Sequence, residues 1–134
     1  MRCPEPWLSF FSLGGITRTL QTNHSPRRIM PDITLKHLDE MERYTGEFQK
    51  GQQFLFAGKS LGLSTLGMNG LRMPPNWEHY PEHDDAADNE EELYVPLEGS
   101  GTLHAEGKTY PMNRGVLIRV GAASRRKIVP DQKA

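Results

Sequence analysis

The sequence predicts a single all-β domain, and three observations lead to that prediction. The chain has 134 residues with 10 prolines and 13 glycines, which favours turns and short strands over long helices. Short apolar and alternating runs follow one another from residue 53 onward. Glycine, proline and asparagine separate these runs at intervals that suit antiparallel connections. Successive short strands of this kind indicate a sandwich or a barrel.

Residues 1–29 differ in composition from the rest of the chain. They carry four arginines against a single acid, Glu5, and include an apolar stretch at 7–16. A secretory signal would need a small-residue cleavage site, and an organellar presequence would need a clear amphipathic pattern; neither is found here. Met30 is a plausible alternative first residue of the protein, since Pro31, Asp32, Ile33 and Thr34 follow it. We therefore expect 1–29 to be a leader, a disordered extension or an upstream stretch misread as coding.

Residues 30–52 are expected to form an N-terminal arm with a short helix, ahead of the β domain at 53–134. Leu35, Leu38 and Met41 recur at helical spacing, and charged residues occupy the remaining face. We expect this helix to pack against the β domain. The predicted strands are 54–57, 61–71, 93–97, 102–105, 116–120 and 127–129.

Charge and cysteine content exclude several classes of function. The 16 basic and 17 acidic residues nearly cancel, so no overall field attracts nucleic acid or a membrane surface. Cys3 is the only cysteine, which excludes an intramolecular disulfide and a zinc site built from thiolates. No apolar run approaches the roughly 20 residues needed to cross a bilayer. We expect a soluble, cytoplasmic protein with neither nucleic acid nor membrane as partner.

One group of side chains could bind a metal ion. Residues two apart on a strand point to the same face, so His83 and Asp85 can be directed at one point, and Glu92 can reach it from the next strand. An imidazole with two carboxylates suits manganese, ferrous iron or zinc and leaves positions open for a substrate. An acidic surface loop with one histidine is also common without a metal, so the spacing alone leaves both interpretations open.

Two stretches resemble the two sequence motifs of the cupin superfamily. The glycine, first histidine, glutamate and closing glycine of the first motif are matched by Gly70, His83, Glu92 and Gly99. Residues 107–115 look like the second motif, with Asn113 in place of its usual proline. The resemblance covers roughly residues 54–129. It implies a double-stranded β-helix, or jelly-roll, barrel with a short N-terminal helical segment; it does not fix a function, because cupins include enzymes, storage proteins and regulatory domains.

The chain departs from the family at two metal-ligand positions. Asp85 stands where the second histidine is usual, and the histidine of the second motif should fall near Arg125 or Arg126. An arginine keeps its proton and cannot coordinate a metal. Its guanidinium would instead form a fork-shaped ion pair with Asp85 and Glu92, or anchor an anionic ligand. The alternative is that both arginines lie exposed at the barrel rim.

These matches and departures support three hypotheses. In the first, a small cupin domain binds a small polar or anionic metabolite in the barrel, retains weak divalent-metal binding, and uses Tyr94, Arg126 and Met68 as ligand contacts. The second is a metal-dependent oxygenase or isomerase that uses His83, Asp85 and Glu92 on iron, manganese or zinc. The third is a non-catalytic regulatory or structural barrel.

Two further expectations concern the missing imidazole and the assembly. His79 shares strand parity with His83 and could replace the lost histidine, although Pro81 interrupts the strand between them. Many cupins dimerise, so the resemblance implies a homodimer. The chain stops five residues after 129, so we expect the N-terminal arm or a partner subunit to cover the open edge; a truncated reading frame is the alternative.

Overall fold

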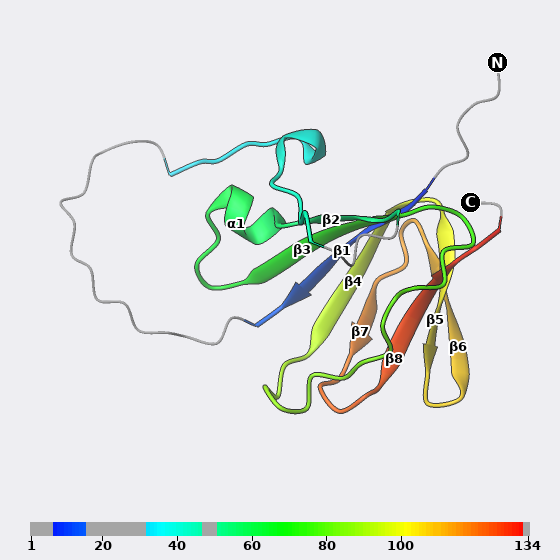
Figure 1. Ribbon diagram of the computed structural model, residues 1–134. Helices are drawn as coiled ribbons and strands as arrows, with labels where there is room; N and C mark the ends of the chain where they lie inside the picture. Colours follow the sequence, from blue (N-terminus) through cyan, green and yellow to red (C-terminus); the bar gives the residue numbers. More distant parts are fainter. Residues whose placement is uncertain (1–6, 16–31, 47–50, 133–134) are drawn as a thin grey trace, which may run out of the picture.

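The computed structural model describes residues 7–15, 32–46 and 51–132, which form two antiparallel sheets (Figure 1). The larger sheet has five strands in the order β2 (Gln53–Leu55), β3 (Gly67–Met73), β1 (Leu8–Gly14), β4 (Glu92–Glu98) and β7 (Ile118–Val120). The smaller has three, in the order β6 (Lys108–Asn113), β5 (Ser100–Ala105) and β8 (Arg126–Pro130). The all-β class is confirmed, and the two sheets do not join into a closed barrel.

Strand β1 corrects the expectation for the start of the chain. The sequence predicts a leader or disordered extension at 1–29, yet β1 lies between β3 and β4 and pairs antiparallel with both. Its alternate side chains Leu8 and Phe10 are 0% and 1% exposed. Residues 8–14 are therefore a central part of the sheet, whereas 1–6 and 16–29 lie outside the described residues.

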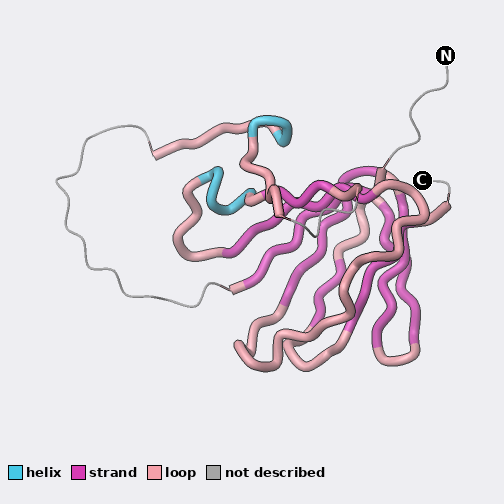
Figure 2. Tube along the Cα trace, viewed as in Figure 1, coloured by secondary structure: helices cyan, strands magenta, loops and turns pink. Residues whose placement is uncertain are grey.

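The helical segments are shorter than predicted and partly in other places (Figure 2). The predicted helix around residues 35–41 is a single 3-10 turn, η1 (Leu38–Glu40), which is capped by His37 and leaves Leu35 exposed. A short helix, α1 (Ala57–Leu61), precedes β3 and ends at Gly62, whose φ of 75° lies in the left-handed region. The predicted strand at 61–71 therefore begins only at residue 67. Strand β6 was not predicted, because its residues were assigned to a turn motif.

The chain passes from the large sheet to the small one at Gly99, between β4 and β5. Gly99 has a φ of 71°, and a Cβ at this position would lie 2.8 Å from the carbonyl oxygen of Trp7. Only glycine tolerates both conditions. Gly99 thus allows one long β segment to contribute to both sheets.

One hydrophobic core joins the two sheets. It contains Leu8, Phe10 and Tyr94 from the large sheet and Leu103 and Ile128 from the small one. The loop at 74–91 passes β8 on its way from β3 to β4 in Figure 1 and contributes Trp77, which is buried in the same cluster. A second, smaller cluster brings Met41, next to η1, against Leu55 and Ala57. Within the described ranges, no helix has the length and apolar character needed to cross a bilayer.

Candidate functional site

The candidate site lies where the 74–91 loop crosses between the two sheets. Residue 83 forms an isolated antiparallel bridge to residue 126 of β8, with N···O distances of 3.0 and 2.9 Å. The amide of Asp85 donates to the carbonyl of Ala122 at 2.9 Å. These main-chain bonds hold His83 and Asp85 beside β8. Glu92 and Tyr94 come from β4, two residues apart and therefore on the same face.

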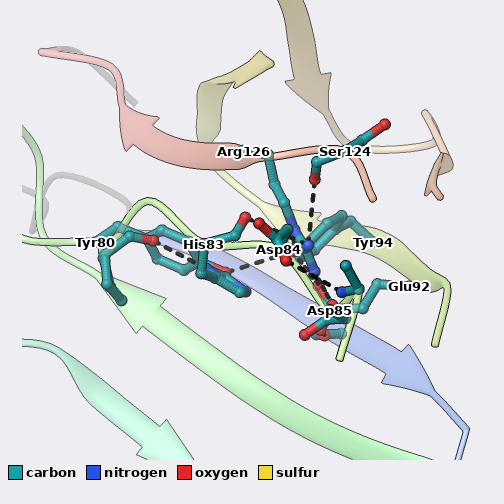
Figure 3. A network of polar contacts seen from close by, with 11 residues as sticks. Tyr80, His83, Asp84, Asp85, Glu92, Tyr94, Ser124 and Arg126 are labelled. Carbon is teal, nitrogen blue, oxygen red and sulfur yellow. Dashed lines mark hydrogen bonds and ion pairs between the residues drawn. The ribbon is translucent and has the colours of Figure 1, made fainter. Parts of the chain in front are cut away.

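Arg126 is the centre of this site, and its side chain is 0% exposed (Figure 3). Its Nη2 forms ion pairs with both Asp85 and Glu92. Its Nε donates to the hydroxyl of Tyr94 at 3.2 Å, and its Nη1 donates to the carbonyls of His83 and Ser124, each at 3.4 Å. All three guanidinium nitrogens therefore have acceptors, as a buried charge requires.

Glu92 is held by three donors from three strands. Ser12 of β1 donates from Oγ to Oε1 at 2.7 Å, while Tyr94 and Arg126 donate to Oε2. Burial acts to raise the pKa of Glu92, but the hydrogen bonds from Tyr94, Ser12 and Arg126 outweigh burial and leave the pKa below its usual value. The carboxylate is therefore ionised at neutral pH and serves only as an acceptor.

Arg126, Tyr94 and Tyr80 stay protonated at neutral pH. Burial acts to lower the pKa of Arg126, but its hydrogen bonds to Asp85, Tyr94 and Glu92 raise the pKa instead. Burial and the nearby Tyr80 and Glu92 raise the pKa of Tyr94. Burial also raises the pKa of Tyr80, to about 12. The network therefore joins one guanidinium to two acidic side chains, Asp85 and Glu92.

The predicted metal-ligand group is brought together. One ligand atom each from His83, Asp85 and Glu92 lies within 4.8 Å of the others, so the group could hold a cation. Nη2 of Arg126, however, already contacts the carboxylates of both Asp85 and Glu92. A metal ion bound there would lie beside a fixed positive charge, or would have to displace it. The donor types fit a divalent cation, but the guanidinium competes for the same oxygens.

A cavity of about 270 Å³ adjoins the network on the large-sheet side. Its walls come from β1, β2, β3 and β4 and from the 74–91 loop. The polar lining residues are Ser12, Gln52, Asn69, His83 and Glu92, and the apolar ones are Phe54, Leu71, Tyr80 and Pro81. The hydroxyl of Tyr80 lies 3.5 Å from that of Tyr94, which connects the cavity wall to the buried network.

The structure separates the predicted site residues into two groups. His83, Asp85, Glu92, Tyr94 and Arg126 meet in one network. Met68 does not join them, because it lies on the opposite face of β3 from Asn69 and Leu71 and packs on the second core cluster.

Of the alternatives left open by the sequence, the structure favours Arg126 over Arg125. Arg125 is 60% exposed and makes ion pairs with Glu82 and Asp84 at 3.5 and 3.7 Å. His79 is exposed and does not belong to the group that could hold a metal. Arg126 itself is not among the residues that line the cavity, so its predicted role as a direct ligand contact remains a prediction.

Several residues of the site were not predicted from the sequence. Ser12 lies in the segment expected to be a leader, and the pairing of β1 with β3 and β4 brings it to the site. Asn69 and Phe54 lie on predicted strands, but nothing in the sequence shows which face of those strands meets the cavity. Tyr80 and Gln52 lie in loops and carry no motif that would identify them.

Comparisons of the chain with protein-family models, with curated proteins and with solved structures found no match.

Proposed function

We propose that this chain is a small-molecule-binding protein of the cupin type, in which a small polar metabolite binds in the cavity beside the Arg126 network. The single observation that carries the proposal is the 270 Å³ cavity, whose walls combine apolar side chains with a few convergent polar groups. Binding sites for small ligands have this composition. The cupin-like motifs and the two antiparallel sheets support the assignment to that architecture.

In this proposal Arg126 takes the structural place of a metal ion. It neutralises one of the two carboxylates, fixes their positions, and ties the loop at 83–85 to β4 and β8. Ser12, Asn69 and His83 are then left to contact a ligand from the cavity side. Homodimer formation and a cytoplasmic location, which the resemblance and the composition imply, belong to the same proposal.

The test is a fragment screen by NMR on the full-length chain and on Asn69→Phe, a substitution that fills the cavity. Asn113→Phe is the matched control, since it makes the same change at an exposed position of β6. We expect fragments that shift resonances of Phe54 and Tyr80 to lose binding in Asn69→Phe and to keep it in Asn113→Phe. Equal binding to both variants, or no fragment that reaches these resonances, would reject the cavity as a ligand site.

A metal-dependent enzyme is the second candidate, because the ligand atoms of His83, Asp85 and Glu92 converge within 4.8 Å. The bound metal would polarise a substrate oxygen in an oxygenase or isomerase. Elemental analysis of protein purified without chelator, beside a His83→Ala control, distinguishes the candidates. Stoichiometric iron, manganese or zinc that is lost in the control would favour the enzyme; no metal after soaking would favour simple ligand binding.

A further inference from the structure

The two carboxylates of the network are partly exposed, whereas its guanidinium is buried. The side chain of Arg126 is 0% exposed, whereas those of Asp85 and Glu92 are 26% and 20% exposed. Glu92 lines the cavity and Arg126 does not. A molecule in the cavity therefore meets the carboxylate, and the guanidinium lies behind it. The cation that could attract an anion is out of reach.

The charge balance leads to the same conclusion. Asp85 and Glu92 share one guanidinium, and Glu92 is the acidic member of the network that lines the cavity. Glu92 stays ionised because Ser12, Tyr94 and Arg126 all donate to it. A carboxylate or phosphate placed in the cavity would meet the like charge of Glu92, which is unfavourable.

A second acceptor at the cavity lacks a partner within the described residues. The side chain of Gln52 lines the cavity, and its Oε1 is buried without a hydrogen bond. Leaving a buried acceptor unsatisfied costs about 1–3 kcal/mol. A ligand N–H or O–H group that reaches this oxygen would satisfy it, whereas a ligand with acceptors only cannot.

The remaining walls set the size and shape of the ligand. Phe54, Leu71 and Tyr80 add apolar surface to the cavity wall beside the polar groups. The volume of about 270 Å³ accommodates about nine water-sized groups at about 30 Å³ each. A molecule with a single flat ring and a short polar arm matches both the volume and the mixed apolar and polar lining.

We infer that the cavity selects a small, uncharged or cationic ligand with hydrogen-bond donors and a flat apolar part, and that it rejects carboxylates and phosphates. The inference rests on the proposed function and narrows its ligand class. Of the two classes that the sequence leaves open, polar and anionic, it retains the polar one. The donors are directed at Glu92 and Gln52, and the ring lies against Phe54 and Tyr80.

Three probes of one shape and different charge test this inference on the full-length chain: benzylamine, which is protonated at neutral pH, benzyl alcohol and benzoate. Binding is followed by NMR titration of the Gln52 side-chain amide and the rings of Phe54 and Tyr80. We expect the Kd values of benzylamine and benzyl alcohol to be at least about tenfold lower than that of benzoate. Benzoate binding equal to or tighter than benzylamine at these resonances would overturn the selectivity and leave the proposed function intact.

Two variants assign the selectivity to particular groups. Glu92→Gln removes the negative charge and should weaken benzylamine more than benzyl alcohol. Gln52→Leu removes the acceptor without a change of charge and should weaken both by about three- to tenfold, as expected for one hydrogen bond. Gln53→Leu is its control, because Gln53 is the neighbouring glutamine and its Oε1 accepts from Arg72 away from the cavity. Equal affinities in Gln52→Leu and Gln53→Leu would contradict the role of Gln52, even if Glu92→Gln fails to fold.

Discussion

At the scale of single residues, Arg126 is the group on which the site depends most. Arg126→Met keeps a long apolar stem and removes the charge, which leaves Asp85 and Glu92 close together without a shared cation. Breaking a buried pair by removal of one partner destabilises a protein by about 3–5 kcal/mol. We expect a loss of this order in the free energy of unfolding measured with urea.

Arg125→Met provides the matched control for this loss. Arg125 is the adjacent residue, but its side chain is 60% exposed and its ion pairs are on the surface. Its removal should change the free energy of unfolding by no more than about 0.5–1 kcal/mol. The combination of Arg126→Met with Asp85→Asn and Glu92→Gln should recover part of the loss, because the unpaired charges are then absent. If Arg126→Met and Arg125→Met had equal effects, the buried network would not be stabilising.

Whether Arg126 occupies the place of a metal ion can be tested by replacing it with a residue that can coordinate one. Arg126→His removes the guanidinium and adds an imidazole near His83, Asp85 and Glu92, whose ligand atoms already converge. We expect Arg126→His to bind cobalt(II), followed by its visible absorption, more tightly than the unsubstituted chain does. The gain should disappear when His83→Ala is added. No gain in affinity would show that the guanidinium does not occupy the position of a cation.

The ionisation of Glu92 predicts how stability depends on pH. Its pKa is lowered in the folded chain from an ordinary value of 4.5, so its charged form is favoured by folding. This stabilisation is complete above the ordinary pKa and is lost as the pH falls through the lower folded-state pKa. Urea unfolding below pH 4.5 should therefore show a steeper decline for the unsubstituted chain than for Glu92→Gln. Glu98→Gln, at an exposed position of the same strand, should leave the slope unchanged.

The chemistry of the site could be predicted from the sequence better than its surroundings. His83, Asp85 and Glu92 were found because their types and spacing suit a shared cation, and Arg126 because it falls near an expected histidine. Those arguments depend only on local sequence and on a motif. Ser12 and Tyr80 contact the same network from distant segments. Only the pairing of β1 with β4 and the path of the 74–91 loop bring them there, and no short-range pattern encodes either feature.

At the scale of secondary structure, β1 should be essential to the fold. Phe10 is 1% exposed and packs edge-on against Tyr94, with ring centroids 5.8 Å apart. Phe10→Ala removes a large core side chain and should cost about 3–5 kcal/mol in the free energy of unfolding. Tyr110→Ala is the control, since Tyr110 is an aromatic strand residue that is 41% exposed. A similar small effect of both changes would show that residues 8–14 are not part of the core.

Strand β1 also shows why element prediction was incomplete. Strands β4, β5 and β8 were predicted close to their observed bounds, because alternating apolar residues are flanked there by glycines or charged turns. The run at 8–14 is short and interrupts the alternation at Phe10 and Phe11, and it lies in a segment whose composition differs from the rest of the chain. Strand β6 was missed for a different reason: its residues are mostly exposed, so no apolar period marks it. A strand with nearly all of its residues exposed has no apolar period that a sequence pattern could detect.

At the scale of the whole molecule, the two sheets are connected in two ways. The hydrophobic core contains residues of both. Arg126 of the small sheet also makes ion pairs and hydrogen bonds with Glu92 and Tyr94 of the large one. Since the sheets do not close into a barrel, these side chains and the β4–β5 connection at Gly99 carry the cooperativity that continuous strand pairing would otherwise provide.

This arrangement predicts that the two sheets open together, and that Arg126 is needed for them to do so. In native-state hydrogen exchange, the amides of Phe10 in β1 and Ile128 in β8 should exchange with the same free energy of opening, because both side chains are buried in the one core. In Arg126→Met the polar connection is lost, so Ile128 should exchange with a lower free energy than Phe10. Arg125→Met should keep the two values equal. Different free energies of opening for Phe10 and Ile128 in the unsubstituted chain would mean that the two sheets are separate cooperative units. The cavity walls on β1 to β4 could then remain folded while the small sheet, with Arg126, opens.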